Sequence, residues 1–291
     1  MADRGIDVVR AHLAKLPPSD SLTTAEHRAQ YERAEKVFPT PSDVKVERVN
    51  APVAPAEWLR PPSAEPGRVV LYLHGGGYVI GSPRSHRHLA AAIAGAAGAS
   101  ALLLDYRLAP EHPFPAAIED AVSAYGWMLE RGIGPDEVTI SGDSSGGGLV
   151  VSVLLTLKQR GLPQPGGAVL MCPWVDLELN LRHDEGMRRF AAAYLGGHPA
   201  DDPVASPLGA DLTDLPPLLI QAATGDDRLM DANALADRAR DHGVDARLEL
   251  YSVDAHVFQL FWSFLPEAAE AVEAAGRFVR DSGARESRVA G

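Results

Sequence analysis

The 291-residue chain has a single cysteine, Cys172, and few aromatic residues. One cysteine excludes an intramolecular disulfide and a cluster of cysteines around zinc. Basic residues are also scarce beside acidic ones, with 27 Lys and Arg against 39 Asp and Glu, so the formal net charge is −12. Such a surface repels phosphate groups, and we therefore expect no nucleic-acid binding and no docking on anionic membranes.

Long hydrophobic runs are missing as well. The apolar run at residues 149–157 ends at Lys158 and is too short to cross a bilayer. The first residues lack the apolar core of a signal peptide, because they carry charges at Asp3, Arg4, Asp7 and Arg10. We expect no membrane span and a cytoplasmic location.

What the chain does have is the composition of a globular protein with a full core, 46% hydrophobic and 23% charged residues. Short apolar runs alternate with helical patterns, which predicts an α/β fold whose mainly parallel sheet has helices on both faces. The predicted strands cover residues 44–49, 56–59, 68–74, 100–106, 138–144, 168–174, 217–223 and 247–251, and the predicted helices cover 86–97, 115–131, 146–160, 230–242 and 266–281.

Two segments do not fit this alternation. The capping-box spacing of Thr23 and Glu26 predicts a helix that continues to about Val37. Residues 176–215 contain neither a clear strand nor one continuous helix, and a long insertion in an α/β core is usually functional. With the N-terminal helices, this insertion can cover the sheet edge at which α/β proteins bind ligands.

The predicted organisation is therefore an α/β core with a small helical cap. The cap consists of an N-terminal segment at residues 1–40 and an insertion at 176–205. The core consists of residues 41–175 and 206–291.

Gly142-Asp143-Ser144-Ser145-Gly146 fits the motif G-x-S-x-G between a predicted strand and a predicted helix, which is the context that the motif needs. The tight turn exposes the hydroxyl of Ser144 at the helix N-terminus. It also directs the backbone N–H of Ser145 toward the position where an oxyanion forms. Ser144 is therefore the candidate nucleophile.

Three other interpretations of this segment are weaker. A nucleophilic Ser145 would place Asp143 where the turn requires a small residue. The similar run of chymotrypsin-like proteases belongs to an all-β fold. A Gly- and Ser-rich turn without chemistry would not account for the motifs that follow.

His74-Gly75-Gly76-Gly77 follows the strand predicted at residues 68–74, where glycines let the backbone approach a ligand. This placement is typical of the second half of an oxyanion hole. We expect Gly75 and Gly76 to donate to the oxyanion together with Ser145, and His74 to shape the loop.

A nucleotide fingerprint is the alternative for these glycines. Gly75, Gly77 and Gly81 have a related spacing, and Asp105 ends the next strand. Pro83, however, delays the helix, so the glycines do not lie in its first turn.

An acid and a base follow later in the chain. Asp226 and Asp227 lie at a strand end, and His256 follows the last strand, which is the order Ser, Asp, His of α/β-hydrolases. A serine hydroxyl needs a base to remove its proton, imidazole titrates near neutrality, and a carboxylate orients the imidazole. His86 and His88 have a spacing that suggests a metal site, but we interpret them as solvated helix residues.

Five ordered motifs resemble the bacterial hormone-sensitive lipase family of carboxylesterases, and the resemblance covers most of residues 40–282. They are HGGG (74–77), DYRLAPEHPFPAA (105–117), GDSSGG (142–147), GDDRLMDA (225–232) and HVFQLF (256–261). The resemblance implies an α/β-hydrolase fold with a helical cap, Ser144 as nucleophile, His256 as base and an aspartate as acid.

The family's acid segment reads D-P-L-x-D. Asp227, Leu229 and Asp231 align with it, which selects Asp227 as the acid, although Arg228 replaces the usual proline. Ser145 replaces the commoner alanine after the nucleophile. The cap insertion is shorter than the family's by about a dozen residues, which predicts a more open pocket.

The predicted function is a serine carboxylesterase that needs neither cofactor nor metal and hydrolyses short- to medium-chain acyl esters. Its partner is a small-molecule ester, and a homodimer is possible through residues 247–251 and the last helix. The alternatives are a deacetylase, lactone hydrolase or amidase of a specialised metabolite, a non-catalytic small-molecule receptor of the same fold, and a nicotinamide-dependent oxidoreductase.

Overall fold

The computed structural model describes all residues except 1–6, 8–21, 39, 53, 181–184 and 283–291. The strands are β1 (Lys45–Asn50), β2 (Pro55–Arg60), β3 (Val69–Leu73), β4 (Ser100–Leu104), β5 (Val138–Asp143), β6 (Gly167–Met171), β7 (Leu218–Ala223) and β8 (Ala246–Tyr251). The helices are α2 (Thr24–Tyr31), α3 (Ala34–Val37), α4 (Pro83–Ala97), α5 (Ala116–Glu130), α6 (Ser145–Gln159), α7 (Glu185–Leu195), α8 (Leu229–Asp241) and α9 (Pro266–Ser282).

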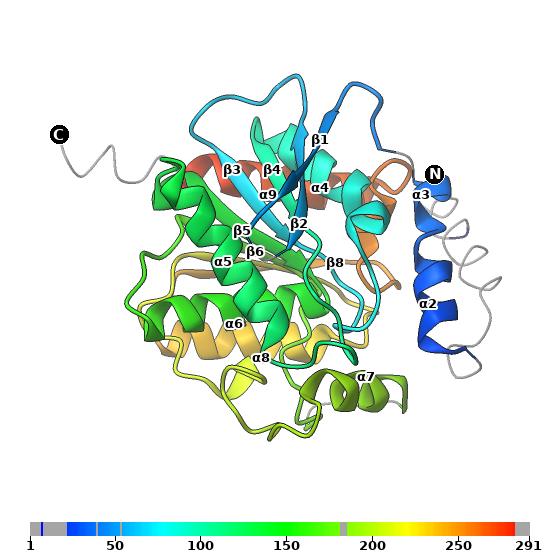
Figure 1. Ribbon diagram of the computed structural model, residues 1–291, viewed down its shortest axis with the longest axis vertical. Helices are drawn as coiled ribbons and strands as arrows, with labels where there is room; N and C mark the ends of the chain where they lie inside the picture. The colour runs from blue at the N-terminus through cyan, green and yellow to red at the C-terminus, as the bar shows by residue number, and fades with distance from the viewer. Residues whose placement is uncertain (1–6, 8–21, 39, 53, 181–184, 283–291) are drawn as a thin grey trace.

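The strands form one sheet in the order β1-β2-β4-β3-β5-β6-β7-β8 (Figure 1). β2 pairs antiparallel with β1 and with β4, and every other pair is parallel. The prediction of a mainly parallel α/β sheet is therefore confirmed.

Helices cover both faces of this sheet, as the sequence predicts. Along β3, Val70 and Tyr72 pack with α4 and α9 on one face, whereas Leu71 and Leu73 pack with α5, α6 and α8 on the other. Successive side chains of a strand point to opposite faces, so a strand buried on both faces must be continuously apolar. The buried run Val69–Leu73 satisfies that requirement.

Two predicted helices differ from the observed ones by more than one residue. α4 begins at Pro83 rather than at residue 86, because Ser82 caps the helix and a proline is well suited to its first turn. The Thr23–Glu26 capping box is present, but α2 ends at Tyr31 and α3 follows it, so the single helix predicted up to Val37 is divided.

The insertion after β6 contains a helix, α7, that the sequence analysis did not predict. Its apolar residues recur on one face of the helix, but only Ala191 and Tyr194 are buried. Tertiary contacts position it instead: the ring of Tyr194 stacks on that of Tyr78 with 3.8 Å between the centroids. The proposed domain boundaries stay a prediction, and most of the predicted N-terminal cap segment lies outside the described residues.

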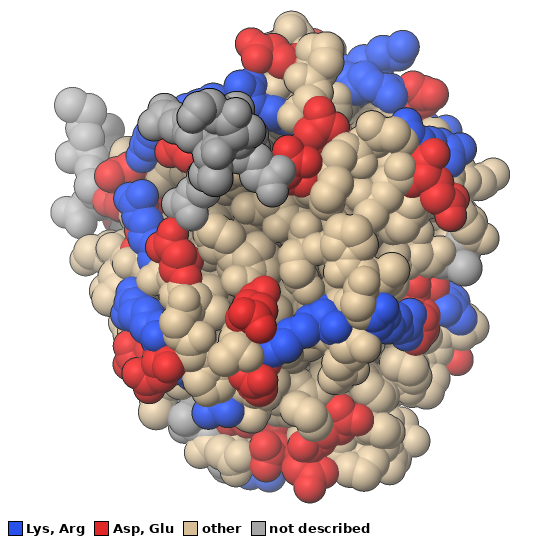
Figure 2. All heavy atoms as spheres, turned by 90° about the vertical axis from the view of Figure 1, so that its left-hand side faces the viewer, with Lys and Arg blue, Asp and Glu red and all other residues tan. Residues whose placement is uncertain are grey.

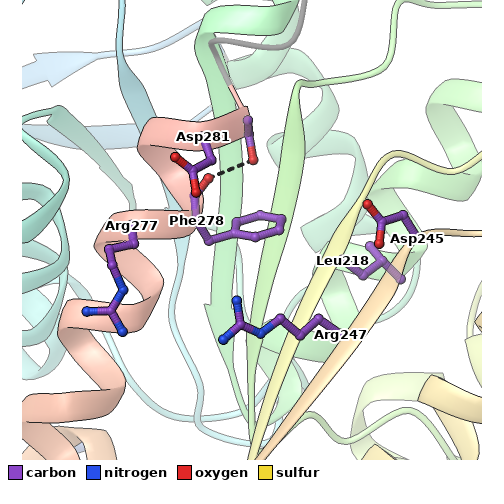
Figure 3. A pocket seen from close by; sticks show the side chains of 7 residues that line it. Leu218, Asp245, Arg247, Arg277, Phe278 and Asp281 are labelled. Atoms are coloured by element: carbon purple, nitrogen blue, oxygen red, sulfur yellow. Dashed lines mark hydrogen bonds between the residues drawn. The ribbon is translucent and has the colours of Figure 1, made fainter.

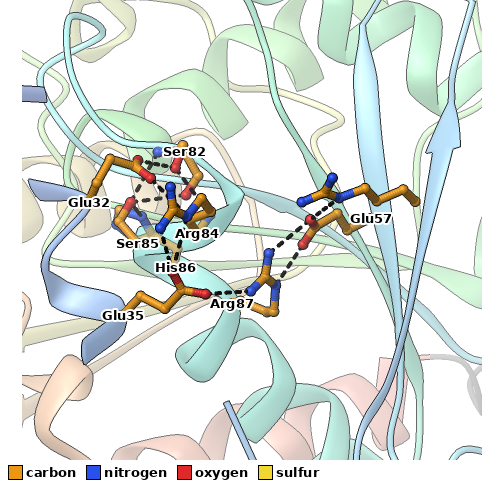
Figure 4. A network of polar contacts seen from close by, with 9 residues as sticks. Glu32, Glu35, Glu57, Ser82, Arg84, Ser85, His86 and Arg87 are labelled. Carbon is orange, nitrogen blue, oxygen red and sulfur yellow. Dashed lines mark hydrogen bonds and ion pairs between the residues drawn. The ribbon is translucent and has the colours of Figure 1, made fainter. Parts of the chain in front are cut away.

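Polar contacts attach α2 and α3 to the core. Arg28 donates to the carbonyl oxygens of Val79 and Ala109 and pairs with Glu111 at 2.7 Å. Figure 4 shows the neighbouring network, in which Glu32 and Glu35 face Ser82, Arg84 and Arg87 of the α4 region, and Arg87 also binds Glu57.

Acidic and basic side chains are interspersed on the face of the molecule that is turned away from α2 (Figure 2). In the described part of the chain, no helix combines the length and the apolar character that crossing a membrane requires.

The connection from β5 to α6 is tight because two glycines allow backbones to touch. A Cβ atom on Gly146 would lie 2.1 Å from the carbonyl oxygen of Leu73, and one on Gly142 would lie 2.5 Å from that of Gly146. Real Cβ atoms do not approach backbone so closely, so a side chain here must displace β3 or the turn.

We expect Gly146→Ala to lower the free energy of unfolding by about 3 kcal/mol or more, because rigid backbone has to move. Gly126→Ala is the matched control, since Gly126 lies inside α5 and a Cβ there meets nothing within 4 Å. That control should raise the free energy of unfolding by about 0.5–1 kcal/mol. Urea denaturation measures both changes, and equal stabilities for the two variants would contradict this account.

Candidate active site

Ser144 lies directly after β5, in the middle of the sheet, at the start of α6. Its backbone has φ 52° and ψ −123°, an uncommon conformation for a residue with a side chain. The amide of Ser144 donates to the carbonyl of Met171 at 2.9 Å, which anchors the turn to β6. This is the strained strand–turn–helix geometry that the G-x-S-x-G motif predicts.

His256 connects Ser144 to an aspartate. Its Nε2 lies 2.8 Å from Ser144 Oγ, and its Nδ1 lies 2.8 Å and 3.0 Å from the two carboxylate oxygens of Asp226. The His256 side chain is 41% exposed and that of Asp226 only 1%. The three residues follow β5, β7 and β8, whose carboxyl ends meet at one edge of the sheet.

The aspartate beside His256 is Asp226, and the prediction of Asp227 is therefore corrected. Asp226 Oδ1 accepts the N–H of Arg228 at 2.9 Å, so this carboxylate turns back across the loop before α8. Asp227 is exposed and lies on the pocket wall. The spacing from Leu229 and Asp231 selects the other carboxylate, because the turn, rather than the count of residues, decides which one points inward.

Opposing effects act on the Asp226 carboxyl. Burial would raise its pKa, but attraction to His256, hydrogen bonds from His256 and Arg228, and the Cys172 thiol lower it below its ordinary value. Asp226 is therefore ionised at neutral pH, as a carboxylate that orients an imidazole must be.

Cys172 is core, as predicted, and it also lies beside this pair. Ligand atoms of Cys172, Asp226 and His256 are all within 4.8 Å of one another. Burial and the Asp226 charge raise the pKa of the thiol, and a neutral thiol is a poor metal ligand. Since Asp226 and His256 also bind each other, this donor set does not suit a metal ion.

The glycines after β3 do not all face the pocket. The N–H of Gly75 donates to Asp143 Oδ1 at 3.1 Å, so the expectation that Gly75 supplies an oxyanion donor is corrected. Gly76 and Gly77 both line the pocket beside Ser144. Neither amide donates to a residue in the described part of the chain. Sequence spacing does not reveal that Asp143 accepts the N–H of Gly75, so it selects Gly75 in place of Gly77.

Ser145 is buried, and its Oγ accepts the N–H of Tyr78 at 3.2 Å. This hydroxyl does not line the pocket, which argues against Ser145 as a nucleophile. The nucleotide-binding alternative is also weakened, because α4 begins at Pro83, beyond Gly75, Gly77 and Gly81.

The histidines behind the loop are buried. Burial and the neighbouring His86 lower the pKa of His74 to about 3, and its ring stacks on Tyr106. His74 is therefore neutral, and its Nδ1 lies 2.8 Å from the carbonyl oxygen of Gly75. That it shapes the loop stays a prediction. The prediction that His86 and His88 are solvated is wrong, since both are buried where α4 packs on the sheet.

A pocket of about 620 Å³ opens above Ser144. Tyr31 of α2 and Met187 and Phe190 of α7 contribute to its wall, so the N-terminal helix α2 and the insertion after β6 both contact it. Its lining comprises Tyr31, Gly76, Gly77, Ile80, Ser144, Trp174, Met187, Phe190, Gly225, Asp226, Asp227, Arg228, Asp254, Ala255 and His256.

A smaller pocket of about 160 Å³ lies between β8 and α9, where Figure 3 shows Arg247, Arg277 and Phe278 around it. It adjoins Leu218, the first residue of β7, and is therefore near the opposite ends of the strands from Ser144. It contains neither the Ser144 hydroxyl nor His256.

Comparisons with known proteins agree with this geometry. A family model described as alpha/beta hydrolase fold matches residues 70–260. An acetyl-hydrolase of Streptomyces hygroscopicus is 43% identical over 269 residues, covering 87% of this chain and 88% of that protein. An ethyl acetate hydrolase of Pseudomonas putida is 31% identical over 287 residues, covering 88% and 89%.

The crystal structure of an esterase from the bacterial hormone-sensitive lipase family is also similar. It has a TM-score of 0.90 and 44% sequence identity, with 97% of each chain covered. The chain therefore belongs to the bacterial hormone-sensitive lipase family of the alpha/beta-hydrolase fold.

A second buried carboxylate binds the segment that follows β6. Asp231, at the start of α8, is 3% exposed. Its Oδ2 accepts the N–H groups of Val175 at 3.0 Å and Asp176 at 3.1 Å. Burial raises its pKa to about 6, since desolvation outweighs these two bonds and the attraction of Arg228.

The raised pKa of Asp231 makes the protein less stable as pH rises. The unfolded carboxyl releases its proton near its ordinary pKa of 3.8, whereas the folded one keeps it until about pH 6. The unfolded state is therefore favoured increasingly between these pH values, by about 3 kcal/mol once both are ionised. Asp231→Asn, which retains an acceptor, should remove this cost.

The quantity of interest is the melting temperature of Asp231→Asn minus that of wild type. We expect this difference to be several degrees larger at pH 8 than at pH 4.5. Asp231→Ala removes the acceptor and should be destabilised at both pH values. Thermal unfolding followed by circular dichroism measures these differences. A difference between Asp231→Asn and wild type that does not vary with pH would contradict the raised pKa.

Proposed function

We propose that the protein is a serine carboxylesterase that works through an acyl-enzyme on Ser144. The observation that carries the proposal is the continuous contact from Ser144 Oγ through His256 to Asp226 on the floor of the pocket. His256 Nε2 removes the hydroxyl proton while Ser144 Oγ attacks the ester carbonyl carbon. The C–O bond to the alcohol then breaks, and the alcohol leaves with that proton.

Water completes the reaction. His256 takes a proton from the water molecule that attacks the acyl carbon, and it returns this proton to Ser144 Oγ as the acid leaves. Asp226 holds the imidazole in the required orientation and stabilises its cation. A receptor without catalysis is disfavoured, because this contact chain includes the base that such a receptor does not need.

The oxyanion donors that we assign are the N–H groups of Gly76, Gly77 and Ser145. Gly76 and Gly77 line the pocket, and Ser145 is the first residue of α6. The partial positive charge of a helix N-terminus supports negative charge there. Fixed donors at a developing oxyanion usually contribute the largest single part of such catalysis.

The substrates that we propose are esters with short or medium acyl chains. Trp174, Phe190 and Ile80 supply apolar walls to a pocket of a size suited to small molecules. Two relatives are named acetyl-hydrolase and ethyl acetate hydrolase, which favours the shortest acyl groups and keeps a deacetylase as the second candidate. A cytoplasmic location and a homodimer stay predictions.

We expect Ser144→Ala to lower kcat for p-nitrophenyl butyrate by about 10³-fold or more, because it removes the attacking oxygen. Asp226→Asn should lower kcat by about 10³-fold, because the imidazole loses the carboxylate that sets its tautomer. Asp227→Asn is the matched change at the neighbouring position, and it should cost less than about tenfold.

Steady-state kinetics on purified variants, with thermal unfolding as a check on folding, separates these outcomes. A larger loss in Asp227→Asn than in Asp226→Asn would show that Asp226 is not the acid. Full activity in Ser144→Ala would refute the acyl-enzyme.

Acyl preference is tested with the p-nitrophenyl esters of acetate, butyrate, octanoate and palmitate. We expect kcat/KM to be highest for acetate or butyrate and lowest for palmitate, since α7 contributes Met187 and Phe190 to the pocket wall and limits the length of the acyl chain. Strict selection of acetate would contradict an open acyl site and would favour the deacetylase. Activity on lactones or anilides without activity on these esters would instead favour the lactone hydrolase or amidase.

A further inference from the structure

The residues on either side of Ser144 hold the two ends of the glycine loop. Asp143 precedes the nucleophile and accepts the N–H of Gly75. Ser145 follows it and accepts the N–H of Tyr78 at 3.2 Å. Gly76 and Gly77 lie between these two bonds and face the pocket. We infer that the side chains of Asp143 and Ser145 are positioning residues, which fix the oxyanion loop (residues 74–78) against Ser144.

The contact at Gly75 is unusually close. A Cβ atom there would lie 2.2 Å from Asp143 Oδ2 and 2.8 Å from the Asp143 carbonyl oxygen. The first glycine of the loop is therefore needed so that its backbone can meet Asp143. Removing the carboxylate would leave both a void and a buried N–H without an acceptor, and the loop could then rotate away from Ser144.

Asp143 is itself held on several sides. It is 0% exposed, its Oδ1 also accepts the Tyr72 hydroxyl at 2.8 Å, and its Oδ2 lies 3.3 Å from His86 Nε2. Burial would raise the pKa of Asp143, but attraction to the nearby His86 and the hydrogen bond from Tyr72 lower it below its ordinary value. The group that holds Gly75 is thus a fixed carboxylate.

The support continues to the cap. His86 Nδ1 lies 2.9 Å from Ser85 Oγ, which donates to the carbonyl of Ser82, and the Ser82 hydroxyl binds Glu32 after α2 (Figure 4). A polar chain therefore connects the cap side of the molecule with the residue next to the nucleophile. It holds the His86 ring beside Asp143, whose Oδ2 lies 3.3 Å from His86 Nε2.

The inference rests on the proposed esterase function, so the test begins with two conditions. Wild type must hydrolyse p-nitrophenyl butyrate, and Ser144→Ala must not. Reactive sites are counted with diethyl p-nitrophenyl phosphate, which releases one p-nitrophenolate for each reactive serine, and every kcat is expressed per reactive site. Failure of either condition counts against the proposed function. It also overturns the positioning role, because there is then no reaction on Ser144 for the loop to assist.

We expect Asp143→Ala to lower kcat per reactive site by about 10²-fold with little change in KM, because a displaced donor weakens only transition-state binding. Ser145→Ala should lower kcat by about three- to tenfold, since one end of the loop stays fixed. Asp143→Asn should restore kcat to within about tenfold of wild type, because its Oδ1 still accepts from Gly75. The Ki of a trifluoromethyl ketone, which forms an oxyanion on Ser144, should rise in parallel with the loss of kcat/KM.

Asp120→Asn is the control for burying an altered carboxyl. Asp120 of α5 is equally buried but binds Arg107 away from the pocket. We expect this variant to lose stability while its kcat and its Ki for the ketone stay those of wild type.

The inference is overturned if Asp143→Ala and Ser145→Ala keep the wild-type kcat and Ki per reactive site, or if they raise KM alone. If Asp143→Ala does not fold, Ser145→Ala decides the matter, because its smaller side chain fits the same space and keeps the backbone N–H. Losses in Asp120→Asn as large as those in Asp143→Asn would also overturn it, since they would reflect general loosening of the fold.

Discussion

β5 becomes α6 within one residue, so Ser144 must adopt a φ of 52° that costs on the order of 1–3 kcal/mol. Packing on three sides maintains this conformation. Its amide donates to Met171 and its carbonyl accepts from Trp174, both at 2.9 Å, while Gly146 lets the Leu73 carbonyl approach. Because β3 and β5 are parallel neighbours, the residues that follow them meet at one edge. The site thus depends on how closely these two strand ends approach.

The floor and the wall of the pocket are held by different forces. The part of the floor that carries Ser144 and Asp226 follows β5 and β7, whose side chains are fully buried, so moving it would expose the core. The wall contributed by α2 is attached through Arg28 and through glutamate–arginine pairs with partly exposed side chains. Exposed pairs of this kind contribute about 0–1 kcal/mol each, so we expect the α2 wall to move or unfold more easily than the floor.

Periodicity and motif context were sufficient for the architecture and for placing Ser144 and His256 together. Buried parallel strands must be continuously apolar, and the G-x-S-x-G turn has one usual context, so both can be predicted from the sequence alone. The choice between Asp226 and Asp227 cannot be predicted in this way, because it depends on a turn that is closed by a hydrogen bond from the Arg228 amide. The burial of His86 depends on a tertiary contact in the same way. A histidine on a helix is expected to be exposed, and the sequence does not show that the buried carboxylate of Asp143 lies next to this one.

That carboxylate has an electrostatic consequence as well as a geometric one. A negative charge close to a developing oxyanion would oppose it, and low dielectric surroundings would strengthen the repulsion. Tyr72 and Gly75 both donate to Asp143 Oδ1, and His86 Nε2 lies 3.3 Å from its Oδ2, so polar groups surround the buried charge. One buried acceptor can then orient the loop without weakening the donors beside it. Asp143 occupies a variable position of the G-x-S-x-G motif. Its buried charge is therefore accompanied by His86, which lies on α4 and is distant in sequence.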